Sequence, residues 1–344
     1  MTTLIRVTTL TGYFRVAHRH GLDPLGLLRE AKIDAASLGK ADYRIPVSSA
    51  CWLLDTSAAR AGCPTFGLEM AELRNKDDAG PVGILLAHQR TLREALYAIV
   101  QYRSLLNDAL GLHIETGGEL VTLREEIIAD VPGKTQQAME LAIGILTKIC
   151  RGLLGQRWKP RSVHFTHAAP ADRRFHRAFF DCPVTFGSDF NGIVCAAVDL
   201  DVPNPMADPE LVRYAETLTR PLNQSQTGLL TLEVRKAIYL LLPMEQAAVD
   251  QVARKLNLSS RTLQRQLAAA GTDFSTLLSD VRHELAMRYL ANVRYPIGRI
   301  AALLGFSRQA SFTRWFIGRC GMTPRTWRTN HKNGGGKEAE VVIQ

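Results

Sequence analysis

The most constraining feature of this chain is a pair of short helices joined by a tight turn, within residues 297–328. Apolar residues recur at helical spacing across residues 297–304, and Gly305 then breaks that helix. Ser307 is a suitable N-cap for a second helix, which we expect to end near Cys320. Two helices separated by a turn of about four residues that contains glycine are typical of a helix-turn-helix motif.

The second of these helices is expected to have an apolar face and a polar face. Phe312 and Phe316 lie four residues apart, so they share the face that turns inward. The other face carries mainly polar side chains that are long enough to contact base edges in a DNA major groove. It consists of Gln309, Ala310, Thr313 and Arg314.

A second copy of this pattern lies about 48 residues upstream, in residues 248–271. Ser259 matches Ser307, and after this position the downstream copy carries one extra residue. Residues 274–291 form a periodic helix that would hold the two copies at a fixed separation, which suits two successive major grooves. The outer face of the upstream copy holds Arg261, Gln264, Arg265 and Ala268.

Residues 245–330 resemble the DNA-binding domain of the AraC/XylS family of bacterial transcription regulators. The resemblance rests on Leu304-Gly305-Phe306-Ser307 and on Gly321-Met322-Thr323-Pro324, followed by Trp327-Arg328. It implies that side chains on both outer faces read DNA bases. These base readers would be Arg261, Gln264, Arg265, Gln309, Thr313 and Arg314.

Other residues of the same segment are expected to support the readers. Ser260 and Arg308 would contact the DNA backbone or cap helices, as would Ser259, Ser307, Thr323 and Arg325. Arg265 and Arg314 have an alternative role as phosphate clamps, which stays open at this point. The expected core consists of Leu263, Leu267, Phe312, Phe316 and Trp327.

The distribution of charge favours DNA as a partner. Residues 245–332 contain 14 lysine and arginine residues against 5 aspartate and glutamate residues, a net charge of +9. The whole chain also has a net charge of +9, so the remainder is close to neutral. A basic excess confined to one segment is typical of contact with phosphate groups.

The N-terminal part is expected to fold as an α+β domain, because helical and strand periodicities alternate along it. Helices are expected from Thr3 to His20 and from Val47 to Ala61, the latter with Trp52 on its inner side. Alternating polar and apolar residues at 110–116 and 120–126 predict a β-hairpin. Further elements are a helix at 134–154, a strand at 162–167, a helix at 172–180, and strands at 184–186 and 193–198.

Several short motifs in this part resemble the arabinose-binding-type N-terminal domain of the same family. Within the family the chain is similar to the VirS-like and ornithine-utilisation-regulator-like group over nearly its whole length. The resemblance implies a small-molecule effector and a homodimer formed through this half, and it leaves the ligand-binding residues unassigned. The motifs are Gly80-Pro81-Val82-Gly83, Thr91-Leu92-Arg93-Glu94-Ala95-Leu96, Phe165-Thr166-His167 and Cys182-Pro183-Val184-Thr185-Phe186-Gly187.

We therefore expect four parts along the chain. These are an effector and dimerisation domain at 1–205, a linker at 206–228, an all-α DNA-binding domain with two helix-turn-helix motifs at 229–332, and a disordered tail at 333–344. The linker is indicated by closely spaced prolines between residues 201 and 209.

The sequence predicts no metal, cofactor or catalytic site. His164 and His167 lie three residues apart on an expected strand, so they face opposite sides. His18 and His20 lie two apart on an expected helix and do not face each other. The six cysteines are scattered without C-x-x-C spacing, which favours buried reduced thiols. Without an apolar run long enough for a membrane span or a signal peptide, a cytoplasmic protein is expected.

The sequence favours a transcription regulator that binds double-stranded promoter DNA, responds to a small-molecule effector and contacts RNA polymerase. In this hypothesis the effector shifts the population between two arrangements of the DNA-binding motifs. Two alternatives stay open: a regulator controlled by protein contacts without a small ligand, and an enzyme fused to a DNA-binding domain. The sequence specifies neither the effector, nor the promoter, nor the sign of regulation.

Overall fold

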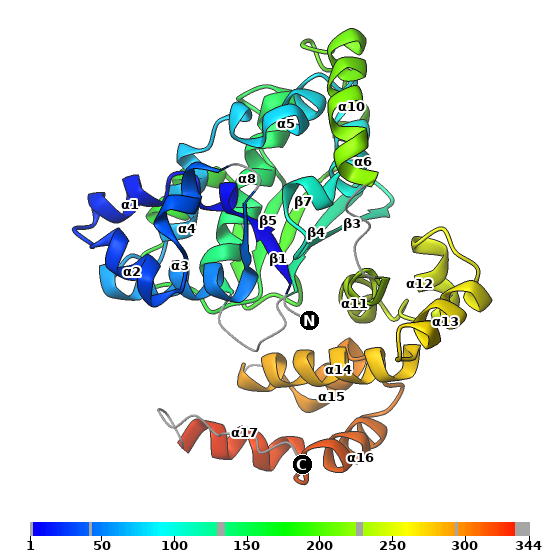
Figure 1. Cartoon of the computed structure of the whole chain (residues 1–344). Coiled ribbons are helices and arrows are strands. Elements are labelled where there is room, and N and C mark those ends of the chain that lie inside the picture. Colours follow the sequence, from blue (N-terminus) through cyan, green and yellow to red (C-terminus); the bar gives the residue numbers. More distant parts are fainter. Residues whose placement is uncertain (1–2, 41–42, 129–134, 225–229, 293–294, 334–344) are drawn as a thin grey trace. The chain divides into compact units, whose positions relative to one another are not determined.

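The computed structural model describes residues 3–40, 43–128, 135–224, 230–292 and 295–333. The chain divides into two compact units, residues 1–229 and residues 230–344 (Figure 1). The first unit combines helices with sheets, whereas the described part of the second is entirely helical. The predicted combination of an α+β domain with an all-α domain is therefore confirmed.

The first unit contains a five-stranded sheet in the order β3-β4-β7-β5-β6. Its neighbouring strands are antiparallel except for β5 and β6, which are parallel. The predicted hairpin is confirmed as β3 and β4, and Gly118 in its turn has a φ of 62°. The strands of this sheet are β3 Leu110–Gly117, β4 Leu120–Ile127, β5 Ser162–Phe165, β6 Val184–Phe186 and β7 Gly192–Ala196.

Helices pack around this sheet and contribute most of the buried core. The α-helices of the first unit are α1 Tyr13–Arg19, α2 Pro24–Glu30, α3 Val47–Ala61, α4 Phe66–Leu73, α5 Gly80–Ala87, α6 Leu92–Gln101, α7 Arg103–Leu106, α8 Gln136–Leu154, α9 Arg174–Phe180 and α10 Pro209–Gln224. Short 3-10 helices lie at Val7–Leu10, Ala35–Gly39, Lys76–Ala79 and Ala197–Asp201. No described helix of the chain is long and apolar enough to cross a membrane.

The prediction of one helix from Thr3 to His20 was wrong. Leu4–Arg6 form strand β1, which pairs antiparallel with β2 (Arg44–Pro46). Gly12 then adopts a φ of 89° at the N-cap of α1, so α1 begins only at Tyr13. The apolar spacing of this segment fits a helix, but pairing with a strand about 40 residues away overrides it.

The inward placement of Trp52 was also wrong. Leu53 and Leu54 of α3 are fully buried, but Trp52 is 40% exposed. Successive helical residues are rotated by about 100°, so a helix that buries Leu53 and Leu54 turns the preceding residue outward. The bounds predicted for α3 itself are confirmed.

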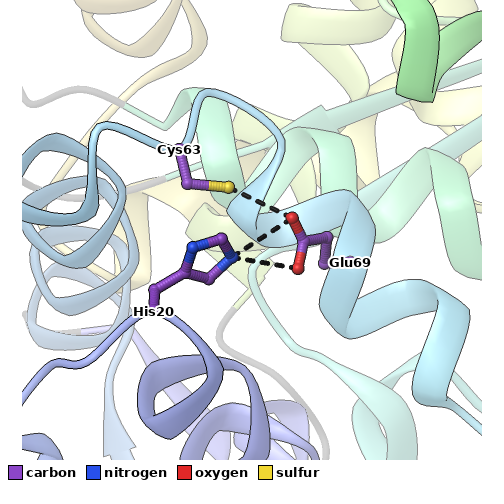
Figure 2. Close-up of side chains that lie close together, drawn as sticks. All are labelled: His20, Cys63 and Glu69. Carbon is purple, nitrogen blue, oxygen red and sulfur yellow. Dashed lines mark hydrogen bonds and ion pairs between the residues drawn. The ribbon is translucent and has the colours of Figure 1, made fainter.

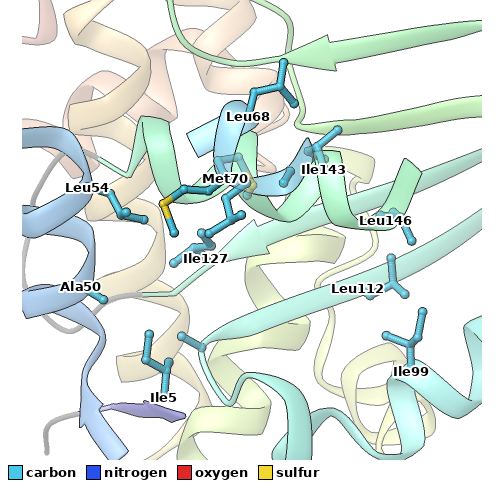
Figure 3. Packing of buried hydrophobic residues seen from close by; sticks show 14 of the residues in the cluster. Ile5, Ala50, Leu54, Leu68, Met70, Ile99, Leu112, Ile127, Ile143 and Leu146 are labelled. Carbon is cyan, nitrogen blue, oxygen red and sulfur yellow. The ribbon is translucent and has the colours of Figure 1, made fainter. Parts of the chain in front are cut away.

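Helix α8 lies close to α4 because small residues at their interface allow the two backbones to approach each other. The Gly67 amide donates to Gln137 Oε1 at 2.8 Å, and a Cβ on Gly67 would lie 2.0 Å from the Gln137 carbonyl oxygen. Farther along α8, a Cβ on Gly144 would lie 2.5 Å from the Ala71 Cβ. Leu68 and Met70 of α4 and Ile143 of α8 pack into the same core (Figure 3).

The segment expected to link the two domains contains helix α10. This helix packs against α5 of the first unit, and residues 225–228 lie outside the described residues. The next helix, α11 (Leu230–Leu241), belongs to the second unit. Of the expected tail, Asn333 ends the last helix, and residues 334–344 lie outside the described residues.

Two glycines of α8 should respond in opposite ways to replacement by alanine. Gly144→Ala should destabilise the protein by about 1–3 kcal/mol, because its Cβ would overlap Ala71. Gly152 is exposed, and a Cβ there meets no atom within 4 Å, so Gly152→Ala should stabilise α8 by about 0.5–1 kcal/mol. Urea unfolding of the two variants measures both effects, and equal stabilities would contradict the close packing of α4 and α8.

Candidate DNA-binding surface

The first helix-turn-helix consists of α12 (Val249–Lys255) and α13 (Ser260–Ala269). Ser259 is the N-cap of α13, and its hydroxyl oxygen accepts a hydrogen bond from the Thr262 amide at 3.1 Å. Leu263 and Leu267 are fully buried, as predicted. The cap and the buried leucines fix how far α13 rotates about its axis, and therefore which residues face outward.

The second helix-turn-helix consists of α15 (Ile297–Leu303) and α16 (Gln309–Cys320). Gly305 follows α15 with a φ of 69°, and Gly321 ends α16 with the same φ, as predicted for both glycines. Phe312 and Phe316 are fully buried, which confirms them as core. Trp327, also expected in the core, is only half-buried.

The N-cap predicted for α16 was wrong by one residue. Arg308 occupies the N-cap position instead of Ser307, and no side chain forms a capping hydrogen bond there. The extra residue of the downstream copy lengthens its turn, so Ser307 lies too early to cap the helix. The orphan amides at the start of α16 are therefore available to an external acceptor such as a DNA phosphate.

The predicted base readers lie at the exposed surface of α13 and α16. Five of them are exposed, and only Thr313 is half-buried. Among the described residues, none forms an ion pair with Arg261, Arg265 or Arg314. The exposed readers are Arg261, Gln264 and Arg265 on α13, and Gln309 and Arg314 on α16.

Two of the residues predicted to support the readers, Arg308 and Ser260, differ in their surroundings. Arg308 is exposed at the N-terminus of α16. Ser260 is half-buried and donates its hydroxyl hydrogen to the Asp250 carboxylate of α12. A contact between Ser260 and a phosphate oxygen would therefore require that this internal bond be broken.

A surface hollow of about 470 Å³ lies beside the start of α16. Gln309 and Thr313 line one side of it, and α17 (Pro324–Asn333) lines another with Arg325 and Thr329. The sequence predicts Arg325 only as a backbone contact or cap, and it gives no signal for Thr329. An arginine and a hydroxyl beside two predicted base readers provide donors suited to a phosphate group.

Helix α14 (Phe274–Ala291) connects the two motifs and holds the turn of the second (Figure 1). Arg282 donates from Nε to the Leu304 carbonyl oxygen at 2.9 Å, and its guanidinium carbon lies 4.5 Å from the centre of the Phe306 ring. Burial lowers the pKa of this guanidinium from its ordinary value. Sequence spacing alone does not reveal the role of Arg282, because its partner lies 22 residues away.

The start of α14 is fixed by a capping aspartate. Asp273 Oδ1 accepts a hydrogen bond from the Thr276 amide at 2.9 Å. Hydrogen bonds from the Thr276 amide and hydroxyl hold the pKa of the Asp273 carboxyl below its usual value. Asp273 is therefore a charged acceptor at neutral pH. The positive end of the helix dipole stabilises a negative charge at this position.

In the first unit, His164 and His167, which were weighed as a metal pair, contact different residues. His164 stacks on Phe190 with ring centres 4.6 Å apart. His167 Nε2 lies 3.3 Å from Glu140 Oε1, and His176 Nε2 lies 3.1 Å from the same oxygen. Burial raises the pKa of Glu140, but its contacts with the two imidazoles hold that pKa below its ordinary value.

The cysteines expected to be buried reduced thiols are free in the structure. Four are buried, and Cys182 and Cys320 are half-buried. Burial raises the pKa of the Cys51 and Cys195 thiols to about 12. These two thiols are protonated at neutral pH and behave as small apolar side chains.

Both parts of the chain match known protein families. Residues 21–204 match the family described as the arabinose-binding domain of AraC transcription regulators, and residues 252–330 match a helix-turn-helix domain family. The regulator VirS of Mycobacterium tuberculosis is 31% identical over 94% of this chain and 96% of its own length. The ornithine utilization regulator of Pseudomonas aeruginosa is 28% identical over 88% of this chain and 91% of its own length.

Among solved structures, the transcriptional regulator CdpR from Pseudomonas aeruginosa is 20% identical, with a TM-score of 0.43. The match covers 89% of this chain and 96% of CdpR.

Replacing Arg282 should weaken the second motif specifically. Arg282→Met keeps an apolar stem but leaves the carbonyl of Leu304 without its donor, so we expect a loss of about 1–3 kcal/mol in unfolding free energy. Amide exchange in residues 300–306 should accelerate in the same variant.

Arg319→Met serves as the matched control, because it removes only a half-exposed ion pair with Asp280, worth at most about 1 kcal/mol. Equal losses from the two variants, measured by chemical denaturation, would show that Arg282 has no special role in the turn.

Proposed function

The chain belongs to the AraC family of transcription regulators, and on that premise we propose that α13 and α16 read two successive major grooves of one promoter site. Family membership carries the DNA-binding function. The exposure of the side chains on α13 and α16 supports the assignment of these two helices as the reading elements. A regulator of this kind needs no catalytic group, and we propose that the chain is not an enzyme.

We assign base contacts to exposed side chains of both reading helices. Arginine can donate two hydrogen bonds to guanine, and glutamine can both donate and accept with adenine, each worth about 1–3 kcal/mol of discrimination. Thr313 is shorter and half-buried, so it suits contact with a thymine methyl group or one hydrogen bond. The proposed readers are Arg261, Gln264, Arg265, Gln309, Thr313 and Arg314.

Phosphate contacts complete the proposed interface. Arg308 stands at the open N-terminus of α16, where unpaired amides and a positive side chain favour the same anion. Arg325 lies across the neighbouring hollow and can hold a second phosphate. We assign Ser260 chiefly to the link with Asp250, because its hydrogen is already donated.

Replacing one reader on each helix tests the two-groove arrangement. Arg261→Ala and Gln309→Ala should each reduce the preference for the specific site by about 1–3 kcal/mol, with little change in non-specific affinity. Fluorescence anisotropy, with DNA from upstream of the chain's own and neighbouring genes across a salt series, measures both quantities.

Gln266→Ala is the matched control, since Gln266 is exposed on α13 but off the reading face. The arrangement fails if the control loses as much selectivity as the readers, or if the unaltered chain never exceeds non-specific binding.

The same assay separates the two roles open to Arg265 and Arg314. A base reader replaced by alanine relaxes specificity at one position of the site. A phosphate clamp replaced by alanine weakens all sequences alike and reduces the salt slope by about 1. The two arginines are tested separately, because each is exposed on a different helix.

We further propose that a small-molecule effector bound to the first unit biases DNA binding, and that the bound chain contacts RNA polymerase. The match of residues 21–204 to an arabinose-binding domain family supports an effector. Adding the small-molecule fraction of a cell extract should change DNA binding by the full chain but not by residues 230–333 alone. An unchanged full chain would favour the alternative, a regulator controlled only by protein contacts.

We propose that two copies of the chain associate through α10. Ala215 and Thr219 of this helix are buried, whereas a second stripe of apolar side chains stays exposed. Leu211, Tyr214 and Leu218 form this stripe, with exposed fractions of 38%, 57% and 40%. Spacings of three and four residues are those of a helix that pairs with another helix.

Placing charges on this stripe should prevent association. The double variant Leu211→Lys with Leu218→Lys should elute as a monomer and bind DNA more weakly, because two like-charged faces no longer bury apolar area. Light scattering after size exclusion measures the mass. Val198→Lys, at a residue that is 74% exposed on another element, is the control. A dimeric double variant would exclude α10 as the contact.

A further inference from the structure

Three potential metal ligands from separate parts of the first unit meet beside α4 (Figure 2). His20 directly follows α1, Cys63 lies in the turn after α3, and Glu69 lies within α4. In the sequence, His20 lies two residues after His18, which is not part of this cluster. Cys63 and Glu69 lie more than 40 residues away, so only the fold brings them to His20.

The distances within this cluster are short. His20 Nε2 lies 3.3 Å from Glu69 Oε1 and 3.1 Å from Oε2, and Cys63 Sγ lies 3.2 Å from Oε1. The three ligand atoms all lie within 4.8 Å of one another. Glu69 and Cys63 are buried, and the His20 side chain is 24% exposed, so it provides the approach from solvent.

The two separations from Glu69 Oε1 are close to those between ligand atoms around a tetrahedral zinc ion. With zinc bonds of about 2.0–2.2 Å to nitrogen and oxygen and about 2.3 Å to sulfur, tetrahedral ligand atoms lie about 3.3–3.6 Å apart. The contacts of Glu69 Oε1 fall short of this by a few tenths of an ångström, which a small outward movement of the side chains supplies. The two separations from Glu69 Oε1 are therefore already near those that such an ion requires, and His20 Nε2 and Cys63 Sγ lie within 4.8 Å of each other.

We propose that His20 Nε2, Cys63 Sγ and Glu69 Oε1 form a binding site for a divalent transition-metal ion of the zinc type. The thiol proton leaves to solvent when the sulfur binds the ion, and water takes the fourth position. A set of one sulfur, one nitrogen and one oxygen atom suits zinc, whereas magnesium and calcium prefer oxygen ligands alone.

The surroundings of the cluster orient the carboxylate for this role. Arg19 Nη1 donates to Glu69 Oε2 at 3.2 Å, whereas Oε1 is the oxygen that contacts Cys63, and His20 Nε2 lies near both oxygens. The Thr65 hydroxyl lies 3.5 Å from Cys63 Sγ and can donate to a thiolate. Outer partners of this kind fix the direction of ligands at metal sites. Arg19 also carries a positive charge, but its side chain is 47% exposed and remains in high dielectric.

A bound ion would tie three elements of the first unit together. These elements are the end of α1, the turn that follows α3, and helix α4 itself. Helix α4 also packs against α8. Without the ion the same atoms form a hydrogen-bonded cluster, so the unit folds in either state. A ligand that binds only the folded state raises the unfolding temperature of the protein, by an amount that increases with the concentration of free ligand.

The test measures Zn²⁺ and Co²⁺ binding by the full-length protein after treatment with a chelator. We expect one equivalent of Zn²⁺ in a chelator competition titration, a raised unfolding temperature, and a thiolate-to-cobalt charge-transfer band with Co²⁺. Cys63→Ser, His20→Gln and Glu69→Gln should each weaken binding by ~100-fold or more, since loss of outer partners alone costs about 10–100-fold. Cys63→Ser should also abolish the charge-transfer band.

His18→Gln and Cys182→Ser are the matched controls, because His18 is exposed outside the cluster and Cys182 is half-buried elsewhere. Circular dichroism of each variant without metal verifies that it is folded. Zn²⁺ binding that is equal in the unaltered protein and in all three cluster variants would overturn the proposal. So would a cobalt band that survives Cys63→Ser, or the absence of any binding at micromolar Zn²⁺.

Discussion

Charged side chains of α14 hold two elements of the second unit, which are α11 and the turn of the second helix-turn-helix motif. Glu284 accepts hydrogen bonds from Arg235 at 2.7 Å and from the Tyr239 hydroxyl, which holds α11. Arg282 donates to carbonyl oxygens in the turn of the second motif. Half-buried charges of this kind stabilise a fold only in the right geometry, so these contacts constrain how α11 and the second turn lie on α14.

The second unit could be predicted in detail because its information is local. Glycine, capping residues and apolar spacing within about ten residues determine where each helix begins and ends. The error at Ser307 shows the limit of this reasoning. One inserted residue moved the N-cap to Arg308, and an alignment with the upstream copy could not tell which residue of the turn absorbs the insertion.

The first unit was predicted less completely because distant contacts decide it. The β3–β4 hairpin follows from local alternation, but β1 forms only through β2, and no local pattern between Leu4 and Arg6 indicates that pairing. The cluster of His20, Cys63 and Glu69 has the same origin. Its members carry no mutual spacing signal in the sequence, so only a three-dimensional structure could suggest the site.

The magnitudes of base contacts determine whether one copy of the second unit can select a promoter. Specific binding typically exceeds non-specific binding by about 4–10 kcal/mol, and each good contact supplies about 1–3 kcal/mol. If Arg265 and Arg314 read bases, the five arginine and glutamine readers together reach the range for specific binding. If both clamp phosphates, Arg261, Gln264 and Gln309 together supply about 3–9 kcal/mol, and the lower end of this sum falls below the range for specific binding. Where each contact is worth only about 1 kcal/mol, specificity then requires association of two copies, because association doubles the contacts and makes the second binding event intramolecular.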